Sequence, residues 1–341
     1  MITLEKVLYL FNDNTYISKQ GDCLVLKIEE LEKLRIPILE IEYIIIFGNV
    51  FISNHIVKLC SDNGIIISYI DMYGNFLGRF YGKNIGNIFL RKKQYDLYDN
   101  NLEFIRNVII AKSINSSNLL RYYSRFDKDE KRAASLYDCY KKILDISQEL
   151  KKAEDIDSIR GIEGSISSVY FSNFDNLLKI NDDLMKFEKR SKNPPENNIN
   201  SLLSLFYTLY TLNISAALES FGLDSQLGYM HKMRSGRASL ACDMIEEFRA
   251  VIVDRFVIKI VNLNQVSSTS FEITGEGIKL KKDDLKKILK LWESYKEEEI
   301  FHPLLKKKIK IKILPYIQAQ LLAKYIRGDI EGYPPFIYKL T

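Results

Sequence analysis

Histidine and cysteine are scarce in this chain of 341 residues, and their scarcity restricts the metal chemistry available to it. The histidines are His55, His231 and His302, and the cysteines are Cys23, Cys60, Cys139 and Cys242. A three-histidine zinc site would need every histidine, and no HExxH motif occurs because Lys232 follows His231. The cysteines form no CxxC pair, which indicates reduced thiols rather than a disulfide framework or a zinc knuckle. The usual zinc-hydrolase designs are therefore excluded.

A phosphate-binding loop is also missing. Gly78 and Gly82 have three residues between them instead of the four of a Walker A loop, and Asn84 stands where the metal-binding hydroxyl belongs. No GxGxxG motif opens a predicted helix. A reaction driven by ATP or NAD would therefore lack its usual binding loop.

Long apolar runs and a secretory signal are absent too. The N-terminus has no basic segment followed by an apolar one. The most apolar stretch, Ile36–Ile52, contains Pro37, Glu40 and Glu42, and it cannot supply the ~20 apolar residues of a membrane span. We expect a cytoplasmic enzyme or binding protein with no membrane partner.

The length and composition describe a folded protein of about two domains. Hydrophobic residues make up 46% and charged residues 27% of the chain, close to the averages for soluble globular proteins. The net charge is +5, but residues 1–100 carry 11 Lys and Arg against 12 Asp and Glu, which leaves 38 against 32 for the remainder. The positive excess therefore lies in the second part, where it would permit binding of a polyanion such as nucleic acid.

The hydrophobic period changes along the chain. Up to Tyr81, short β-branched and aromatic runs alternate with turn residues such as 12–14, 20–22 and 72–75, and only Ser53–Asp62 has helical spacing. From Gln94 onward the period is helical. The longest predicted helices are Leu102–Ser113, Ala133–Lys152, Ile199–Ser220, Ser239–Val261 with Ser239 as N-cap, and Lys282–Glu299. We predict an α+β fold with a small mostly-β domain (1–82), a linker (83–94) and a larger all-α domain (95–341).

Carboxylates at helical spacing follow His231. Asp243 and Glu246 are three residues apart, so they share one face of the predicted helix and can converge on one cation. Hard divalent metals bind such oxygens, and Mn²⁺ accepts imidazole most readily among them. The alternative is a solvated helix face made of Glu246, Glu247 and Arg249.

A further carboxylate, Glu163, stands between two glycines in the segment RGIEGS. Each glycine costs ~1 kcal/mol relative to alanine inside a helix, so a helix surface explains this pattern poorly. We interpret the glycines as permitting close approach of backbone or substrate.

With these residues in view, the sequence resembles the CRISPR-associated adaptation integrase family, a family of metal-dependent DNA endonucleases. The resemblance covers nearly the whole chain and is closest to the form that accompanies type I systems. Its blocks are Phe76–Gln94, Arg160–Phe171, Lys189–Leu212, Gly222–Arg255 and the closing Tyr333–Phe336. Two positions depart from the family pattern, Ala238 where proline is common and Asn193 where a basic residue often stands.

The resemblance implies a fold and a site. The family fold is a β domain joined to a larger helical catalytic domain, and the β domain is expected to mediate dimerisation. Carried over by position, the metal ligands and catalytic residues are Glu163, His231 and Glu246, with Asp243 as an additional candidate ligand. The metal would be Mg²⁺ or Mn²⁺. Candidate DNA-binding residues in the same blocks are Lys189, Arg190, Lys192, Lys232, Arg234 and Arg237.

The resemblance also implies an activity and partners. Two protomers would each direct a 3′-hydroxyl of a short DNA fragment against a phosphodiester of CRISPR repeat DNA, which integrates the fragment. Double-stranded and branched DNA would be substrates, and a small companion adaptation protein would join two dimers into a heterohexamer. Because transesterification exchanges one phosphodiester for another, the missing phosphate-binding loop is expected.

Two alternatives stay open. One is a catalytically inactive DNA-binding scaffold of the same fold, and the other is a metal-dependent phosphodiesterase outside CRISPR adaptation. The basic run Lys306–Lys312 is compatible with DNA contact or with a soluble helix or strand edge. Trp292, near Ile288 and Leu289, is predicted to pack in the core.

Overall fold

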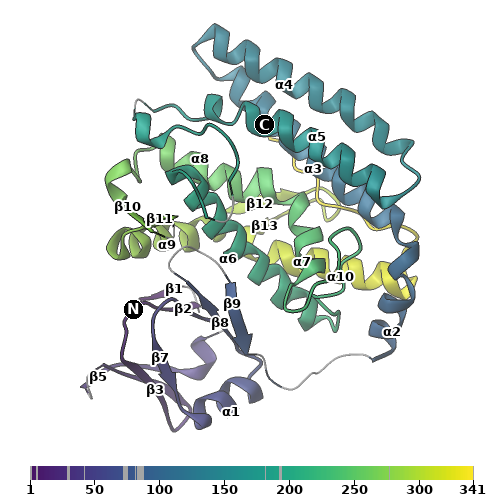
Figure 1. Ribbon diagram of the computed structural model, residues 1–341. Coiled ribbons are helices and arrows are strands. Elements are labelled where there is room, and N and C mark those ends of the chain that lie inside the picture. The colour runs from purple at the N-terminus through teal and green to yellow at the C-terminus, as the bar shows by residue number, and fades with distance from the viewer. Residues whose placement is uncertain are drawn as a thin grey trace.

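The structure is a computed structural model that describes residues 2–4, 7–28, 31–41, 43–71, 76–80, 82, 88–180, 182–191, 194–275 and 277–340. The predicted turn at 72–75, residues 83–87 of the predicted linker, Lys192 and Asn193 lie outside the described residues. The described part has a β-rich N-terminal region followed by a larger helical region, as Figure 1 shows. This division confirms the predicted α+β fold.

In the described residues, two sheets and one α-helix form most of the N-terminal region. The five-stranded sheet has the order β1-β2-β6-β8-β9, and the four-stranded sheet has the order β5-β4-β3-β7. Their strands are β1 (Ile2–Leu4), β2 (Val7–Leu10), β3 (Thr15–Gln20), β4 (Cys23–Ile28), β5 (Leu31–Pro37), β6 (Tyr43–Ile46), β7 (Val50–Ile52), β8 (Ile66–Ile70) and β9 (Phe76–Phe80). The helix α1 (Asn54–Asp62) follows Ser53 and buries Ile56, Leu59 and Cys60, which confirms the helix predicted there.

Side chains alternate along the central strands and therefore enter two different cores. On β2, Val7 and Tyr9 join the core of the helical region, whereas Leu8 and Leu10 pack with Ile56 of α1 inside the N-terminal region. The central strands β2 and β6 are buried on both faces of the sheet, which explains their continuous apolar runs.

The helical region consists mainly of long helices. They are α2 (Ile88–Asp96), α3 (Leu102–Arg125), α4 (Glu130–Gln148), α5 (Ile156–Ser172), α6 (Asn198–Ser220), α7 (Ser239–Met244), α8 (Arg255–Asn262), α9 (Lys282–Lys296) and α10 (Leu314–Arg327). The helix α6 runs through the centre of the region in Figure 1. It is long and apolar enough to cross a membrane, but 78% of its apolar window is buried, as in a core helix. Trp292 of α9 is fully buried, as predicted.

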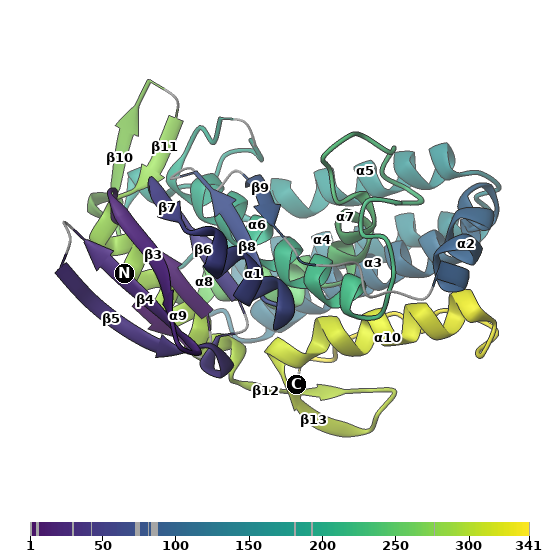
Figure 2. The ribbon, with the colours of Figure 1, turned by 90° about the horizontal axis from the view of Figure 1, so that it is seen from below.

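The helical region differs from the all-α prediction by two antiparallel hairpins. They are β10 (Phe271–Thr274) with β11 (Gly277–Leu280), and β12 (Glu299–His302) with β13 (Lys307–Lys310). The basic run Lys306–Lys312 supplies β13, so its alternation of lysine with isoleucine follows the period of a strand. Figure 2 shows the β12–β13 hairpin beside α10, away from the interface between α5 and α3.

Polar contacts hold the two regions together. Arg79 of β9 forms an ion pair with Glu219 near the end of α6 at 2.5 Å and donates a hydrogen bond to Ser225 at 2.9 Å. The hydroxyl of Tyr9 on β2 donates to Glu293 of α9, also at 2.5 Å. The helix α2 begins at Ile88, so the residues predicted as a linker include the first turns of a helix.

Candidate functional site

A cavity of about 550 Å³ brings together the three predicted metal ligands. Glu163, His231 and Glu246 all line it, together with residues of α3 and α6. Asp243 does not line it. The site is therefore assembled from elements that are far apart in the sequence.

Glu163 lies in the middle of the helix α5, contrary to the interpretation of its glycine-flanked segment. Asp155 caps the helix by accepting a hydrogen bond from the backbone N–H of Ser158 at 2.6 Å. Burial of Ile159, Ile166 and Tyr170 on the inner face outweighs the helix cost of Gly161 and Gly164. A Cβ atom built on either glycine meets nothing within 4 Å, so no other segment of the described part of the chain packs against them. The backbone-approach interpretation was wrong, and the substrate alternative remains.

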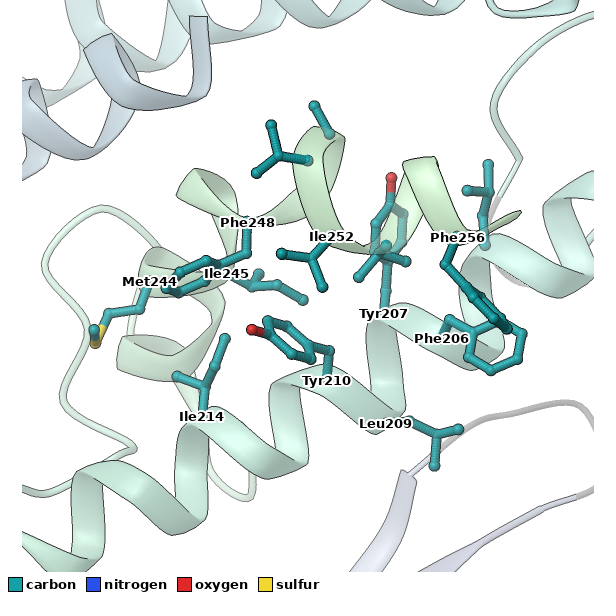
Figure 3. Packing of buried hydrophobic residues seen from close by; sticks show 14 of the residues in the cluster. Phe206, Tyr207, Leu209, Tyr210, Ile214, Met244, Ile245, Phe248, Ile252 and Phe256 are labelled. Carbon is teal, nitrogen blue, oxygen red and sulfur yellow. The ribbon is translucent and has the colours of Figure 1, made fainter. Parts of the chain in front are cut away.

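The segment predicted as one helix over Ser239–Val261 is instead broken into four parts. After α7 come a 3-10 turn, η6 (Ile245–Glu247), a π-helical segment, η7 (Arg249–Asp254), and then α8. Ala238, not Ser239, occupies the N-cap position. Figure 3 shows the broken helix packed on α6, where the rings of Tyr210 and Phe248 lie 5.6 Å apart. Such π-helical insertions change which way successive side chains point, and they are frequent at functional sites.

The carboxylate of Asp243 lies against the ring and the backbone N–H of His231. One of its carboxylate oxygens accepts hydrogen bonds from the backbone N–H groups of Tyr229 and Met230. The other oxygen accepts from the backbone N–H of His231 at 2.9 Å and lies 2.7 Å from Nδ1 of the same residue. A carboxylate on Nδ1 fixes the imidazole with a proton there and leaves Nε2 as an acceptor or metal ligand.

The loop before α7 is compact because glycine permits it. A Cβ atom on Gly228 would come within 2.7 Å of the backbone carbon of Ser239, so only glycine fits there. Gly236 has a φ of +78°, a left-handed conformation that favours glycine. The close approach of Gly228 to Ser239 places the segment that carries His231 against the start of α7.

Glu163 and Glu246 meet at one ammonium group, that of Lys112 on α3. The Nζ atom of Lys112 donates a hydrogen bond to Oε1 of Glu163 and forms an ion pair with Oε2 of Glu246 at 2.8 Å. Nζ also lies 2.9 Å from the hydroxyl oxygen of Ser167. The two carboxylates are thus held near each other by a cation that belongs to the protein.

The charges around this cluster keep its carboxylates ionised. Burial acts to raise the pKa of Glu246, but Arg249 and Lys112 together lower it to about 2. Burial acts on Glu163 in the same direction, and Lys112 again prevails, so its pKa lies below its usual value. For Lys112 burial favours the neutral form, whereas Glu246 and Glu163 raise its pKa above the ordinary value. All three groups are charged at neutral pH.

A second buried cluster forms the wall of the cavity behind Glu246. Arg249 forms an ion pair with Oε1 of Glu246 at 3.0 Å and lies over the ring of Tyr207, 4.5 Å from its centroid. Asp254 accepts hydrogen bonds from the hydroxyls of Tyr207 and Tyr170. Burial raises the pKa of Asp254 to about 6, although both tyrosines act against the shift.

The predicted DNA-binding residues divide by location. Lys189, Arg190 and Arg237 line the cavity that holds Glu163, whereas Lys232 and Arg234 line two neighbouring cavities. Lys189 is exposed and pairs with Glu196 at 3.3 Å. Arg190 is engaged within the fold, because it donates to Asn200 at 2.7 Å and lies over the ring of Tyr207. Lys192 lies outside the described residues.

The chemistry of the donor set fits a divalent cation. Within the described ranges, no group of three or more His, Cys, Asp or Glu side chains has the arrangement of a formed metal site. Lys112 takes the central position instead. The charged partner of the buried Oε2 of Glu246 is the ammonium group of Lys112, at 2.8 Å. Two ionised carboxylates and an orientated imidazole are ligands that Mn²⁺ and Mg²⁺ accept.

Sequence reasoning missed Lys112, Tyr207 and Asp254 as parts of this site. A signal for Lys112 does exist in the helical period. The buried face of α3 includes three residues at intervals of four, namely Val108, Lys112 and Ser116. A lysine on an apolar stripe must be paired when buried, which indicates a carboxylate partner elsewhere in the chain.

Comparisons with known proteins agree with this architecture. The family model described as CRISPR associated protein Cas1 matches residues 8–294. A CRISPR-associated endonuclease Cas1 from Chlorobaculum tepidum is 38% identical over 336 residues, which cover 97% of this chain and 98% of the relative. Another, from Rhodospirillum rubrum, is 34% identical over 344 residues, which cover 99% of this chain and all (100%) of the relative.

Solved structures share the fold over almost the whole chain. A Cas1 protein from Thermotoga maritima has a TM-score of 0.82 at 23% identity, covering 98% of this chain and 99% of that one. A chain of a Cas6-RT-Cas1–Cas2 complex has a TM-score of 0.78 at 21% identity, covering 98% of this chain and 36% of that chain. Because the family model spans most of the sequence and full-length relatives exceed 30% identity, the chain belongs to the CRISPR-associated Cas1 family.

Proposed function

We propose that the protein is a divalent-metal-dependent DNA endonuclease and integrase of CRISPR adaptation. It inserts short foreign DNA fragments into the CRISPR repeat array by attack of a 3′-hydroxyl group on a phosphodiester. One observation carries the proposal: Glu163 and Glu246 meet at a single cation in a cavity that His231 also lines. The relatives from Chlorobaculum tepidum and Rhodospirillum rubrum are named endonucleases, which supports the same class of activity here.

The side chains of the cavity supply binding and orientation. Glu163, Glu246 and Nε2 of His231 would hold Mg²⁺ or Mn²⁺, which when bound polarises a phosphodiester and stabilises the leaving oxygen. Asp243 keeps the imidazole in the tautomer that presents Nε2. Arg249 fixes Glu246 from the other side. Residues 163, 231 and 246 are thus the proposed ligands, and Asp243 has the role of orienting His231.

Basic residues would hold the DNA backbone across the cavity. Lys189 and Arg237 are the candidates that can reach a phosphate at the cavity itself, since Arg190 is engaged within the fold. Lys232 and Arg234 lie farther along the surface, where they would contact flanking phosphates. Such contacts position DNA without distinguishing its sequence, so preference for repeat DNA would need other contacts.

The N-terminal region is the proposed dimer interface. Tyr16 of β3 and Phe51 of β7 are register partners on the four-stranded sheet, and both are about half exposed. Neighbouring exposed aromatic side chains on one sheet face would bury apolar area in a homodimer. The proposed domain limits are 1–82 for this region and 95–341 for the catalytic region, with 83–94 between them.

The assembly and location follow from the same proposal. One solved chain of similar fold belongs to a complex that contains Cas2 as well as Cas1. By analogy, a small companion adaptation protein would bridge two dimers of this chain into a heterohexamer. DNA integration into a bacterial or archaeal repeat array would take place in the cytoplasm.

The test is strand joining with a branched or half-site DNA and Mn²⁺. Glu163→Gln removes one ligand charge while preserving shape, and we expect joining to fall about 100-fold or more. Glu188→Gln is the matched control, because Glu188 lines the same cavity but is exposed and lies outside the cluster. Equal joining by wild type and Glu163→Gln would overturn the site assignment.

The same experiment decides between catalysis and a scaffold. The ion pairs of Lys112 give the cavity a stable arrangement without metal, which is also what an inactive DNA-binding scaffold would contain. If the wild type binds branched DNA but neither cleaves nor joins it with Mn²⁺ or Mg²⁺, the scaffold alternative is correct. Activity without preference for branched or repeat DNA would indicate a phosphodiesterase outside CRISPR adaptation.

A further inference from the structure

Lys112 occupies the point at which the two proposed metal-ligand carboxylates converge. Its Nζ atom contacts Oε1 of Glu163 and Oε2 of Glu246, and its side chain is only 10% exposed. The three residues come from α3, α5 and η6, which no short-range sequence contact would bring together. A buried lysine between two carboxylates is a cation supplied by the protein at a site that otherwise suits a metal.

We propose that Lys112 is an exchangeable counter-ion of the metal site, which holds Glu163 and Glu246 together until a divalent cation displaces it. This inference rests on the proposed function, because it concerns the same carboxylates. Without a cation between them, two ionised carboxylates in one buried cavity repel each other and would move apart. Lys112 prevents this separation while the metal is absent.

Displacement follows from competition for the same oxygen atoms. A divalent cation bound by Glu163 and Glu246 would take the lone pairs that now face the ammonium group, and its charge would repel that group. Lysine is suited to leave, because its charge sits at the end of four flexible methylene groups. The cavity beside it, which Ser116 and Lys189 also line, offers space for the ammonium group and for a DNA phosphate that would attract it.

Arg249 provides the contrast that identifies Lys112 as the mobile cation. Arg249 contacts the other carboxylate oxygen of Glu246, Oε1. The guanidinium of Arg249 also lies over the ring of Tyr207. That ring restrains Arg249 independently of the carboxylate. Within the described residues, the polar partners of Lys112 are the two carboxylates and the hydroxyl of Ser167. A metal ion would therefore remove most of what holds Lys112 and little of what holds Arg249.

The test measures Mn²⁺ binding by the full-length protein without DNA. Free Mn²⁺ is followed by electron paramagnetic resonance, and thermal unfolding is recorded in EDTA and in Mn²⁺. Lys112→Met removes the competing charge, so we expect the Kd for Mn²⁺ to fall about tenfold or more. The variant should unfold at a lower temperature than wild type in EDTA, and Mn²⁺ should raise its Tm by more than it raises that of wild type.

A matched control separates this effect from the loss of any buried ion pair. Lys296 is 7% exposed and pairs with Glu293 at 2.8 Å in α9, away from the cavity. Lys296→Met should also lower the Tm, but its Mn²⁺ affinity and its Tm response to Mn²⁺ should equal those of wild type. Lys112→Gln serves as a second variant, since it removes the charge but keeps an N–H donor, on a shorter side chain.

The outcomes distinguish the inference from the proposed function. Tighter Mn²⁺ binding by Lys112→Met or Lys112→Gln, with no change in Lys296→Met, supports the counter-ion role. Mn²⁺ affinity equal to or weaker than that of wild type in folded Lys112 variants overturns it and leaves the metal site standing. Failure of wild type and of every variant to bind Mn²⁺ would overturn the metal site and the inference with it.

Discussion

Glu246 and Glu247 are neighbours in one short turn, yet their carboxylates have entirely different partners. Both are buried, with exposures of 4% and 0%. Glu246 faces the cavity, where Lys112 and Arg249 carry full positive charges. Glu247 faces the C-terminal tail, where its carboxylate accepts hydrogen bonds from the hydroxyl of Tyr333 and the backbone N–H of Phe336, both at 2.6 Å.

The two carboxyl groups respond oppositely to similar burial. Burial acts to raise both pKa values, but formal charges lower that of Glu246 to about 2. Among the described residues, the donors to Glu247 are uncharged and include Gln318, and burial raises its pKa to about 8. Hydrogen bonds from neutral groups therefore do not compensate desolvation here, whereas cations do. The surroundings of Glu246 in the cavity (the cavity side) are suited to exchange one cation for another. The contacts of Glu247 with the C-terminal tail (the tail side) form a fixed anchor.

The anchor also positions the cavity side. Asn115 of α3 donates hydrogen bonds to the backbone carbonyls of Glu247 and Phe336, at 2.7 and 2.8 Å. Because Lys112 lies one turn earlier on α3, the tail ties the helix that supplies the cation to the turn that supplies Glu246. Because the tail contacts hold the turn rigidly, the cation beside Glu246 can be exchanged without loss of the turn's position.

Removing the side chain of Phe336 is the most direct way to disrupt the packing of the C-terminal tail against Glu247. Its side chain is fully buried against Phe248 and His302, with ring centroids 6.0 and 5.5 Å away. We expect Phe336→Ala to lower the free energy of unfolding by about 3–5 kcal/mol, measured by urea denaturation. Phe89→Ala is the control, because Phe89 is 75% exposed and its loss should cost within about 0.5 kcal/mol. Equal effects of the two substitutions would mean that the tail does not anchor the turn.

The pKa contrast predicts a pH dependence carried by Glu247. Its folded pKa of about 8 exceeds the ordinary value of 4.5, so the folded state binds the extra proton between these values. Stability contributed by this group is therefore present at low pH and is lost as the pH rises toward 8. Relative to Glu247→Gln, wild type should lose about 2–4 kcal/mol of unfolding free energy between pH 5 and pH 8.

The comparison with Glu247→Gln removes the other titrating groups from this measurement. Asp254 and His302 also have shifted pKa values in or near the interval, but both proteins contain them. Glu246 provides the opposite case, because stability from its lowered pKa is lost only as the pH falls from about 4.5 toward 2. Glu246→Gln should leave the slope between pH 5 and pH 8 unchanged. The same slope in wild type and Glu247→Gln would contradict the contrast.

The sequence predicted what depends on local pattern. The mostly-β character of the N-terminal region, the helix α6 and the burial of Trp292 follow from period and composition, and the structure confirms them. The break after Met244 was not predicted, because apolar residues continue at helical spacing through the π-helical segment. The hairpin β10–β11 was missed because its strands have only four residues each, too few for a clear period.

The partners of each charged residue could not be predicted from local pattern. Asp243, Glu246 and Glu247 formed one acidic group in the sequence, yet each faces a different set of donors. These donors come from residues 112, 231 and 333, which only the tertiary fold brings to the turn. The resemblance supplied residue types for the ligands, whereas Lys112 required the long-range packing of α3 against η6.

The smallest expected effects come from replacing the two glycines near Glu163. Gly164 follows Glu163 and lines the cavity, whereas Gly161, one turn earlier on α5, does not. Neither position would bring a Cβ atom within 4 Å of another described segment, so Gly161→Ala and Gly164→Ala should each stabilise the fold by about 0.5–1 kcal/mol.

If DNA approaches the backbone beside Glu163, only Gly164→Ala should slow strand joining, because its added methyl group would project toward the substrate. Urea denaturation and the joining assay, run on both variants, measure the two effects separately. Joining at the wild-type rate by Gly164→Ala would show that substrate does not need the space, and both glycines would then be a simple cost to helix stability.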